Sequence, residues 1–304
     1  MNVFPLYTEF LEKHIIKKIS TGKSGVDVFE LDDNRVAKYA LQTRINDDSI
    51  WRACQKESQF FSEHSKREYF FLPEVYVNIC NEQEFLILMK KYRPIERSEL
   101  DELLLDEIMN ILSKIHMIGV SDHMHPQNTG PIYFERSILE ECVDGWESVL
   151  CEHGDHFDRK GLQLVKEYIN PVNSLFYEPH IWFTHGDFHI ENLLRDVSDE
   201  IIVCDWQSCA GGNNSGDISF FISRLSADGY DVDNRRIIET YCKCMEIMNQ
   251  PVKASDIDIQ IKLANVNVSF QFWHEYLHGN SKERVNEIYS KMIEDMQSLL
   301  NTRN

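Results

Sequence analysis

The sequence contains no apolar run that approaches the length of a membrane-spanning helix. Its amino terminus, MNVFPLYTEFLEKHIIKK, also lacks the basic start, continuous apolar segment and cleavage site of a secretory signal. The eight cysteines form no CxxC pair and no other metal-ligand spacing. These absences argue against a membrane protein and a structural zinc site. They predict a soluble protein of the cytoplasm with reduced thiols.

Basic residues are also scarce, because 31 Lys and Arg face 50 Asp and Glu, for a formal net charge of −19. Binding to nucleic acid depends on clustered basic side chains, so the balance argues against a nucleic-acid partner. A cationic ligand would be attracted, although acidity can also serve solubility alone. With 304 residues, 42% of them apolar, the chain can build one large domain or two lobes. No obligate protein partner is evident.

The most informative segment is HGDFHIENLL, residues 185–194, followed by IIVCDWQ ending at residue 207. A kinase-type site uses an Asp that receives the proton of the attacking hydroxyl, an Asn five positions later and a second Asp on the next strand, both of which bind Mg²⁺. Asp187, Asn192 and Asp205 supply this set in order. The alternative is a surface loop that carries polar residues by chance.

The spacing within this segment is typical of a β-hairpin. Leu193 and Leu194 enter a strand, Asp196–Asp199 form a turn, and Ile201–Cys204 have the β-branched content of a buried strand. The second strand therefore returns Asp205 to the cavity that holds the first two residues.

A nucleotide-binding lobe is expected to precede the motif. Two expected strands, residues 15–20 and 26–31, flank a small-residue stretch in which the amides of Ser24 and Gly25 could approach phosphate oxygens. An ordinary hairpin turn would look the same.

The next expected strand, residues 35–39, places Lys38 beneath that loop, where it could reach the α- and β-phosphates. A helix over residues 49–63 carries Glu57, which can pair with Lys38 and hold its ammonium group. A surface ion pair is the alternative for both residues.

Residues 75–79 and 85–89 predict a further hairpin. Residues 90–94 then form the connector to the second lobe, where Tyr92 could stack on a purine. From Ser98, which resembles a helix cap, the apolar spacing predicts a buried helix that reaches His116. His116 on that apolar face is interpreted as a core histidine.

These motifs resemble those of the aminoglycoside phosphotransferase and choline kinase family, over almost the whole chain. The resemblance implies an α+β, two-lobed protein-kinase-like fold with a small antiparallel-sheet lobe, residues 1–93, and a larger, mainly helical lobe, residues 94–304. It implies Asp187 as catalytic base, Asn192 and Asp205 as Mg²⁺ ligands, and Lys38 with Glu57 as the nucleotide-phosphate pair.

Departures from the protein-kinase pattern favour a small acceptor. Gly186 stands where protein kinases carry Arg, and only eleven residues separate Asp205 from Asp217, which leaves no room for a long activation loop. By the same resemblance Asp217 supports the catalytic loop. His185 is expected to orient that loop through hydrogen bonds, and His189 either does likewise or faces solvent.

The acceptor site is the least determined part. Its candidate walls are residues 133–178 and the carboxy-terminal helices, and the candidate contacts are Asp155, Asp158, Trp273 and Glu275, which could receive ammonium groups or a quaternary nitrogen. The sequence predicts a Mg²⁺-dependent kinase that uses ATP or GTP, with an aminoglycoside-like antibiotic as acceptor. The alternatives are a kinase for choline, ethanolamine or a sugar, and a nucleotide-binding pseudokinase.

Overall fold

The computed structural model describes residues 8–21, 26–45, 47–125, 130–154, 157–230 and 233–302. The chain forms two compact units. The first contains Met1–Ile115, His185–Ala210 and Arg224–Asp231, and the second contains His116–Thr184, Gly211–Ser223 and Val232–Asn304. The expected boundary between functional lobes at residue 93 stays a prediction.

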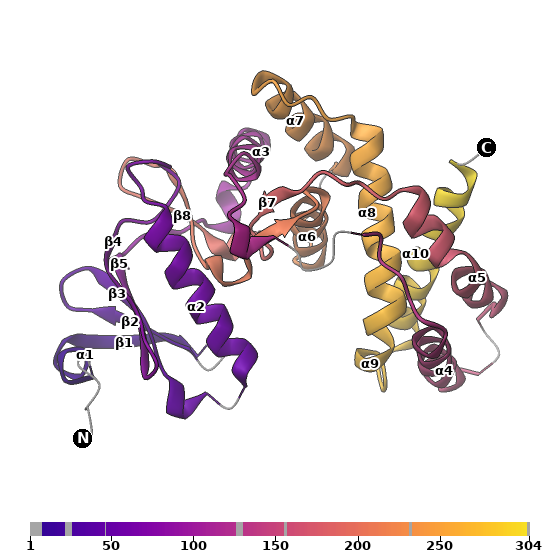
Figure 1. The fold of residues 1–304 in the computed structure, drawn as a ribbon, viewed down its shortest axis with the longest axis horizontal. Helices are drawn as coiled ribbons and strands as arrows, with labels where there is room; N and C mark the ends of the chain where they lie inside the picture. Colours follow the sequence, from indigo (N-terminus) through magenta and orange to yellow (C-terminus); the bar gives the residue numbers. More distant parts are fainter. Residues whose placement is uncertain are drawn as a thin grey trace. The chain divides into compact units, whose positions relative to one another are not determined.

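The first unit is built on a five-stranded antiparallel sheet with the strand order β1-β2-β3-β5-β4 (Figure 1). Helix α1 lies beside β1, and the expected strands are confirmed to within two residues at each end. The elements are α1 (Thr8–His14), β1 (Ile15–Thr21), β2 (Asp27–Leu31), β3 (Arg35–Leu41), the 3₁₀ turn Gln42–Arg44, α2 (Asp48–Glu63), β4 (Val75–Cys80) and β5 (Glu84–Lys90).

The two faces of this sheet bury alternate residues, as the period of a strand requires. Ala37 and Tyr39 of β3 belong to a cluster with Leu11 of α1. Ala40 belongs to the other cluster, with Trp51 and Cys54 of α2. Lys38, between Ala37 and Tyr39, therefore shares the face that α2 covers.

Helix α2 begins at Asp48, where the side chain of Asp47 accepts a 2.8 Å hydrogen bond from the N–H of Ser49. Its buried side chains include Trp51, Cys54 and Glu57, which follow each other at three-residue intervals and so share one side of the helix. A carboxylate thus lies on the buried side of α2. Such a group requires a partner.

Within the first unit, the segment of residues 185–207 forms the expected hairpin. Strand β8 (Leu193–Arg195) pairs antiparallel with β9 (Ile201–Val203), and β6 (Arg93–Pro94) completes a three-stranded sheet. The 3₁₀ turns Ile190–Asn192 and Trp206–Ser208 flank the hairpin. Both candidate metal ligands are therefore fixed at one end of a rigid hairpin.

The helix expected from Ser98 begins later. Residues Arg97–Glu99 form a 3₁₀ turn, and α3 spans Glu102–His116. The prediction of Ser98 as the cap was wrong, because the Asp101 side chain accepts a 2.8 Å hydrogen bond from the N–H of Leu104. Ser98 precedes the first turn of α3 by too many residues to cap it.

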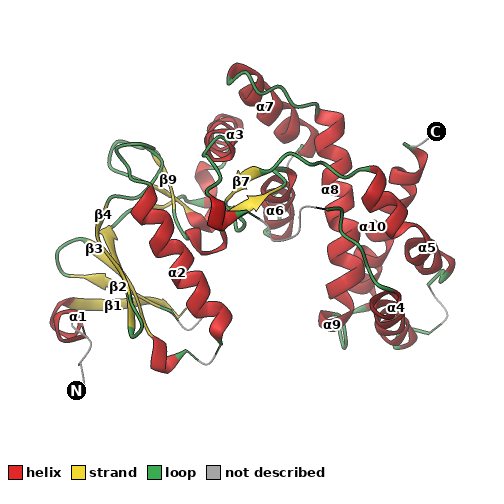
Figure 2. Ribbon diagram, in the orientation of Figure 1, coloured by secondary structure: helices red, strands yellow, loops and turns green. Residues whose placement is uncertain are grey.

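The second unit is mainly helical (Figure 2). Its short strands β7 and β10 pair with each other. Its elements are the 3₁₀ turn Asp122–Met124, α4 (Arg136–Cys151), α5 (Lys160–Leu175), β7 (Trp182–Thr184), β10 (Ala210–Gly212), α6 (Ser215–Ala227), which ends in the first unit, α7 (Asn234–Ile247), α8 (Ala254–Val268), the π-helical turn Ser269–Trp273, α9 (His274–Tyr276) and α10 (Lys282–Asn301).

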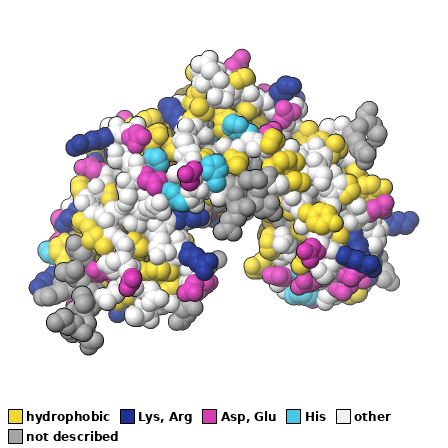
Figure 3. Space-filling view, viewed as in Figure 1, with side chains coloured by type: hydrophobic (Ala, Val, Ile, Leu, Met, Phe, Trp, Pro, Cys, Tyr) yellow, Lys and Arg dark blue, Asp and Glu magenta, His cyan; other side chains and the backbone are white. Residues whose placement is uncertain are grey.

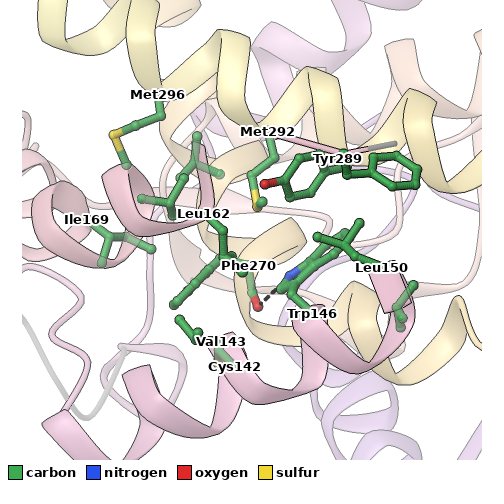
Figure 4. Close-up of a cluster of buried hydrophobic side chains, with 14 of the residues drawn as sticks. Cys142, Val143, Trp146, Leu150, Leu162, Ile169, Phe270, Tyr289, Met292 and Met296 are labelled. Carbon is green, nitrogen blue, oxygen red and sulfur yellow. Dashed lines mark hydrogen bonds between the residues drawn. The ribbon is translucent and has the colours of Figure 1, made fainter. Parts of the chain in front are cut away.

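The core of the second unit gathers around Trp146 of α4, with side chains from α5 and α10 (Figure 4). The Trp146 Nε1–H group donates to the carbonyl oxygens of Ser269 at 3.1 Å and Phe270 at 3.2 Å. A π-helical turn interrupts the regular ladder of backbone hydrogen bonds. Trp146 therefore satisfies two carbonyl groups that the widened turn presents to the core.

Among the described residues, no helix combines the length and the apolar character needed to cross a bilayer. On the face drawn in Figure 3, acidic and basic side chains are interspersed over the described part of the molecule.

Candidate active site

Lys38 lies at the centre of a buried ionic cluster in the first unit. Its Nζ atom is 2.7 Å from Glu57 Oε2 and 2.6 Å from Asp205 Oδ1. Burial alone would lower the pKa of Lys38, but the carboxylates of Glu57 and Asp205 outweigh it and the net shift is upward. Lys38 is therefore an ammonium ion, and the predicted pairing of Lys38 with Glu57 is confirmed.

Glu57 also contacts the loop that follows β9. Its Oε1 accepts a 3.2 Å hydrogen bond from the backbone N–H of Trp206. The Trp206 ring stacks on Phe60 of α2, with centroids 4.3 Å apart and planes 15° apart, and its Nε1–H donates to the Val203 carbonyl at 2.8 Å. One carboxylate and one aromatic ring therefore fasten the Asp205 loop to α2.

Asp205 occupies the left-handed region of backbone space, with φ 66° and ψ 63°. For a residue with a side chain this conformation carries strain, which is typical of functional sites. Its Oδ1 contacts Lys38, and among the described residues no group contacts Oδ2. The side chain is 40% exposed and can offer a hard oxygen ligand to a metal ion.

Asn192 is oriented by the residue that the motif assigns as base. Its Nδ2–H₂ group donates to the Asp187 carbonyl at 2.8 Å and approaches Asp187 Oδ2 at 3.2 Å. The amide oxygen of Asn192 consequently faces away from Asp187. Its backbone carbonyl accepts from the Cys204 N–H at 2.9 Å, which ties it to the residue before Asp205. The donor set of Asn192 and Asp205, two oxygens, suits Mg²⁺.

Asp187 is half-buried and remains ionised. Burial raises the pKa of the Asp187 carboxyl, but the side chains of His189 and Asn192 act in the opposite direction and the net shift is downward. A carboxylate that is ionised at neutral pH can accept a hydrogen bond from an alcohol. This is the protonation state that a general base of the kinase type requires.

His185 is fully buried and connects two parts of the site. Its Nδ1 accepts a 3.3 Å hydrogen bond from the Asp187 N–H, so its proton lies on Nε2, which donates to the Cys204 carbonyl at 3.0 Å. The neutral ring satisfies both contacts. His185 therefore makes the hydrogen bonds expected of it, and its importance for activity stays a prediction.

Gly186 allows a close backbone approach. Its φ is +79°, and a Cβ atom at this position would stand 2.5 Å from the carbonyl oxygen of Ser208. Only glycine combines this conformation with this contact. The loop that carries Asp187 and the loop that follows Asp205 can therefore touch because Gly186 has no side chain.

Asp217 belongs to the second unit, where it lies in a buried polar network. His116 Nε2 is 3.2 Å from Asp217 Oδ2, and His116 Nδ1 is 2.7 Å from the Tyr241 hydroxyl. Asn214 Nδ2 also reaches that hydroxyl, at 3.0 Å. The buried position predicted for His116 is confirmed. The network fixes the Asp217 carboxylate, and its predicted support of the catalytic loop stays a prediction.

The other predicted nucleotide contacts are placed as follows. Ser24 and Gly25 lie outside the described residues. Tyr92 is buried, its hydroxyl accepts a 2.8 Å hydrogen bond from the Glu74 N–H, and the Nζ atoms of Lys66 and Lys90 lie 5.8 and 5.6 Å from its ring centroid. These contacts anchor Tyr92 to its own unit. Its stacking on a purine stays a prediction.

The candidate acceptor contacts fall in the second unit, apart from Asp155, which lies outside the described residues. Asp158 Oδ1 accepts a 3.0 Å hydrogen bond from the Lys160 N–H at the start of α5. The Arg284 guanidinium lies 5.6 Å from the Trp273 ring centroid, and Glu275 is exposed. Their role in binding an acceptor stays a prediction.

Sequence reasoning did not identify Trp206 as a structural anchor, nor the link between His116 and Asp217. A signal was available for Trp206, since a large aromatic residue directly after a buried strand and the candidate metal ligand Asp205 is expected to enter the core. For His116 and Asp217, 101 positions separate the partners, and no local pattern predicts such a pairing.

A scan against protein-family models finds no match, and a search of curated proteins finds none. Solved structures do match. An aminoglycoside 2'-phosphotransferase-IIIa variant with GDP gives a TM-score of 0.60 at 12% identity, over 98% of this chain and 97% of its own. ADP-bound aminoglycoside phosphotransferase APH(2'')-Ib gives 0.57 at 15% identity, over 96% and 97%. Choline kinase LicA from Streptococcus pneumoniae gives 0.57 at 12% identity, over 95% and 97%. The predicted α+β kinase-like fold is confirmed.

Proposed function

We propose that this protein is a kinase that transfers the γ-phosphoryl group of a nucleoside triphosphate to a hydroxyl of a small molecule. The observation that carries the proposal is that one compact unit brings together the candidate phosphate and metal ligands and the candidate base. Lys38 contacts Glu57 and Asp205, and Asn192 contacts Asp187. The fold that the chain shares with phosphotransferases and choline kinases supports the same conclusion.

Each of these residues has a separate role in the proposed reaction. Lys38 holds the phosphates, because an ammonium group has three donors and Glu57 and Asp205 engage two of them. Asn192 and Asp205 would hold Mg²⁺, which supplies positive charge beside the transferred group. Asp187 orients the acceptor hydroxyl and takes its proton as the phosphoryl group passes in line. This direct transfer needs no covalent enzyme intermediate.

The donor is ATP or GTP. Solved structures of the same fold contain ADP, ATP, GDP or AMP, which supports a nucleotide at the corresponding place in this chain.

The proposed acceptor is an aminoglycoside-like antibiotic, a polycation that a chain of net charge −19 attracts. Phosphorylation in the cytoplasm would then give resistance. Choline, ethanolamine or another amino alcohol or sugar is the second candidate, supported by the similarity to choline kinase LicA. One observation weighs against Trp273 as a binding face for quaternary nitrogen, because Arg284 already lies over its ring.

A pseudokinase would bind nucleotide without transfer. The ionised Asp187 and the complete set of candidate base and metal-ligand residues argue against a pseudokinase.

The test is nucleoside-diphosphate release by the purified protein with Mg²⁺ and ATP or GTP, across aminoglycosides, choline, ethanolamine and sugars. Asp187→Asn should lower turnover about 10²–10⁴-fold and leave nucleotide binding intact. Asp258→Asn, which removes a carboxylate from a partly exposed pair with Lys262 on α8, is the matched control and should keep wild-type turnover. Nucleotide binding without release for any acceptor would favour the pseudokinase.

A further inference from the structure

His189 lies next to the candidate base Asp187, on the side of its Oδ2 atom. Its Nε2 is 3.6 Å from Asp187 Oδ2, and its side chain is 11% exposed. The distance is longer than a hydrogen bond, as is common for catalytic contacts before substrate binds. A small shift of the imidazole would therefore bring Nε2 within hydrogen-bonding distance of Asp187 Oδ2.

The other side of the ring faces a second carboxylate. His189 Nδ1 is 3.6 Å from Glu191 Oε2, and the same oxygen is 3.0 Å from Nη2 of Arg224. Nδ1 and Nε2 lie on different sides of an imidazole ring, and both donate only when the ring carries two protons, which lets it lie between two carboxylates. A chain of contacts thus runs from Arg224 through Glu191 and His189 to Asp187, all within the first unit.

The two oxygens of Asp187 differ as a result. Asn192 Nδ2 and His189 Nε2 both approach Oδ2. Within the part of the chain that the structure describes, no side chain contacts Oδ1. A carboxylate held through one oxygen keeps the other at a defined place, which is what in-line transfer to a hydroxyl demands.

We infer that His189 is a positioning residue, which holds Oδ2 of Asp187 together with Asn192 so that Oδ1 is the oxygen that receives the acceptor hydroxyl. The inference rests on the proposed function. It assigns Glu191 and Arg224 the task of fixing the imidazole.

Substitutions of His189 can distinguish a role in positioning the Asp187 carboxylate from a role in the structure of the loop. His189→Ala should lower kcat about 10–100-fold with little change in the KM for nucleotide. His189→Gln, whose amide nitrogen replaces Nε2, should recover most of the loss. His189→Asn, whose amide nitrogen replaces Nδ1, should not. His14→Ala is the control, since His14 is an exposed imidazole that contacts Asp32 at 3.1 Å.

Wild-type kcat in His189→Ala, or equal recovery by Gln and Asn, would overturn the inference. Crystal structures of the wild-type protein and His189→Ala provide a readout that does not depend on turnover. The inference expects the Asp187 carboxylate to rotate in the variant, and an unchanged carboxylate would refute it. Absence of transfer by the wild-type protein would instead count against the proposed function.

Discussion

Lys38 and Asp205 are 167 positions apart in the sequence, and their side chains meet at 2.6 Å. The contact joins the expected phosphate-binding residue to an expected metal ligand. Glu57 completes the cluster from α2. The cluster therefore holds the candidate phosphate-binding and metal-binding groups together through three charges, two of which are almost fully buried.

Lys38→Met should strongly lower activity and destabilise the fold. It leaves Glu57, which is 1% exposed, as an unpaired buried carboxylate, at a cost of about 3–5 kcal/mol in the free energy of unfolding. It also removes the proposed phosphate contact, and kcat/KM should fall about 10²–10³-fold. Urea unfolding and diphosphate release measure the two effects.

The double variant Lys38→Met/Glu57→Leu separates them. Replacing both partners by apolar side chains should restore most of the stability, because no buried charge is left, while the activity stays lost. A double variant as unstable as the single one would show that the charge of Glu57 is not the cause.

Gly186→Ala should cost more than an alanine at another glycine of the same conformation. Gly229 has φ +81°, and a Cβ atom added there would meet no other atom within 4 Å, so Gly229→Ala should lose only about 1–2 kcal/mol in the free energy of unfolding. At Gly186 the new methyl group meets Ser208, and the catalytic loop must shift. We expect turnover about 10²-fold lower for Gly186→Ala and unchanged for Gly229→Ala. Equal turnover in both variants would show that the close approach of Gly186 to Ser208 does not affect activity.

The thiols around the site should be unreactive at neutral pH. Burial raises the pKa of Cys54, Cys204 and Cys209 to about 12 in each case. The thiol form therefore prevails below that pH, and at pH 8 only about one molecule in 10⁴ carries a given thiolate. Iodoacetamide followed by mass spectrometry should modify the exposed Cys151 first. Modification of Cys204 as fast as Cys151 in the native protein would contradict this expectation.

The sequence predicted the parts of the site that local patterns encode. The hairpin between Asn192 and Asp205 follows from β-branched runs around an Asp-rich turn, and the strand with Lys38 follows from its flanking residues. Glu57 lies on the apolar side of its helix, which is a readable sign of a buried partner. These elements depend on neighbours in the chain, so their placement could be predicted.

Long-range contacts could not be predicted in the same way. The hydrogen bond from the Trp206 N–H to Glu57 joins segments 149 positions apart. It forms because the chain that follows β9 packs against the side of α2. The contact between His116 and Asp217 likewise depends on packing within the second unit. The predicted start of α3 was wrong because the sequence offers both Ser98 and Asp101 as helix caps. Only the hydrogen bond from the Leu104 N–H to the Asp101 side chain identifies Asp101 as the cap.

The burial of Trp206 limits which compounds could inhibit the protein. A ligand that gains affinity by displacing Trp206 would have to break the stacking on Phe60, the bond to Val203 and the backbone bond to Glu57 together. A bulky competitor designed to open that space would therefore bind poorly. Selective inhibitors should instead be sought among molecules that bind the site without displacing Trp206.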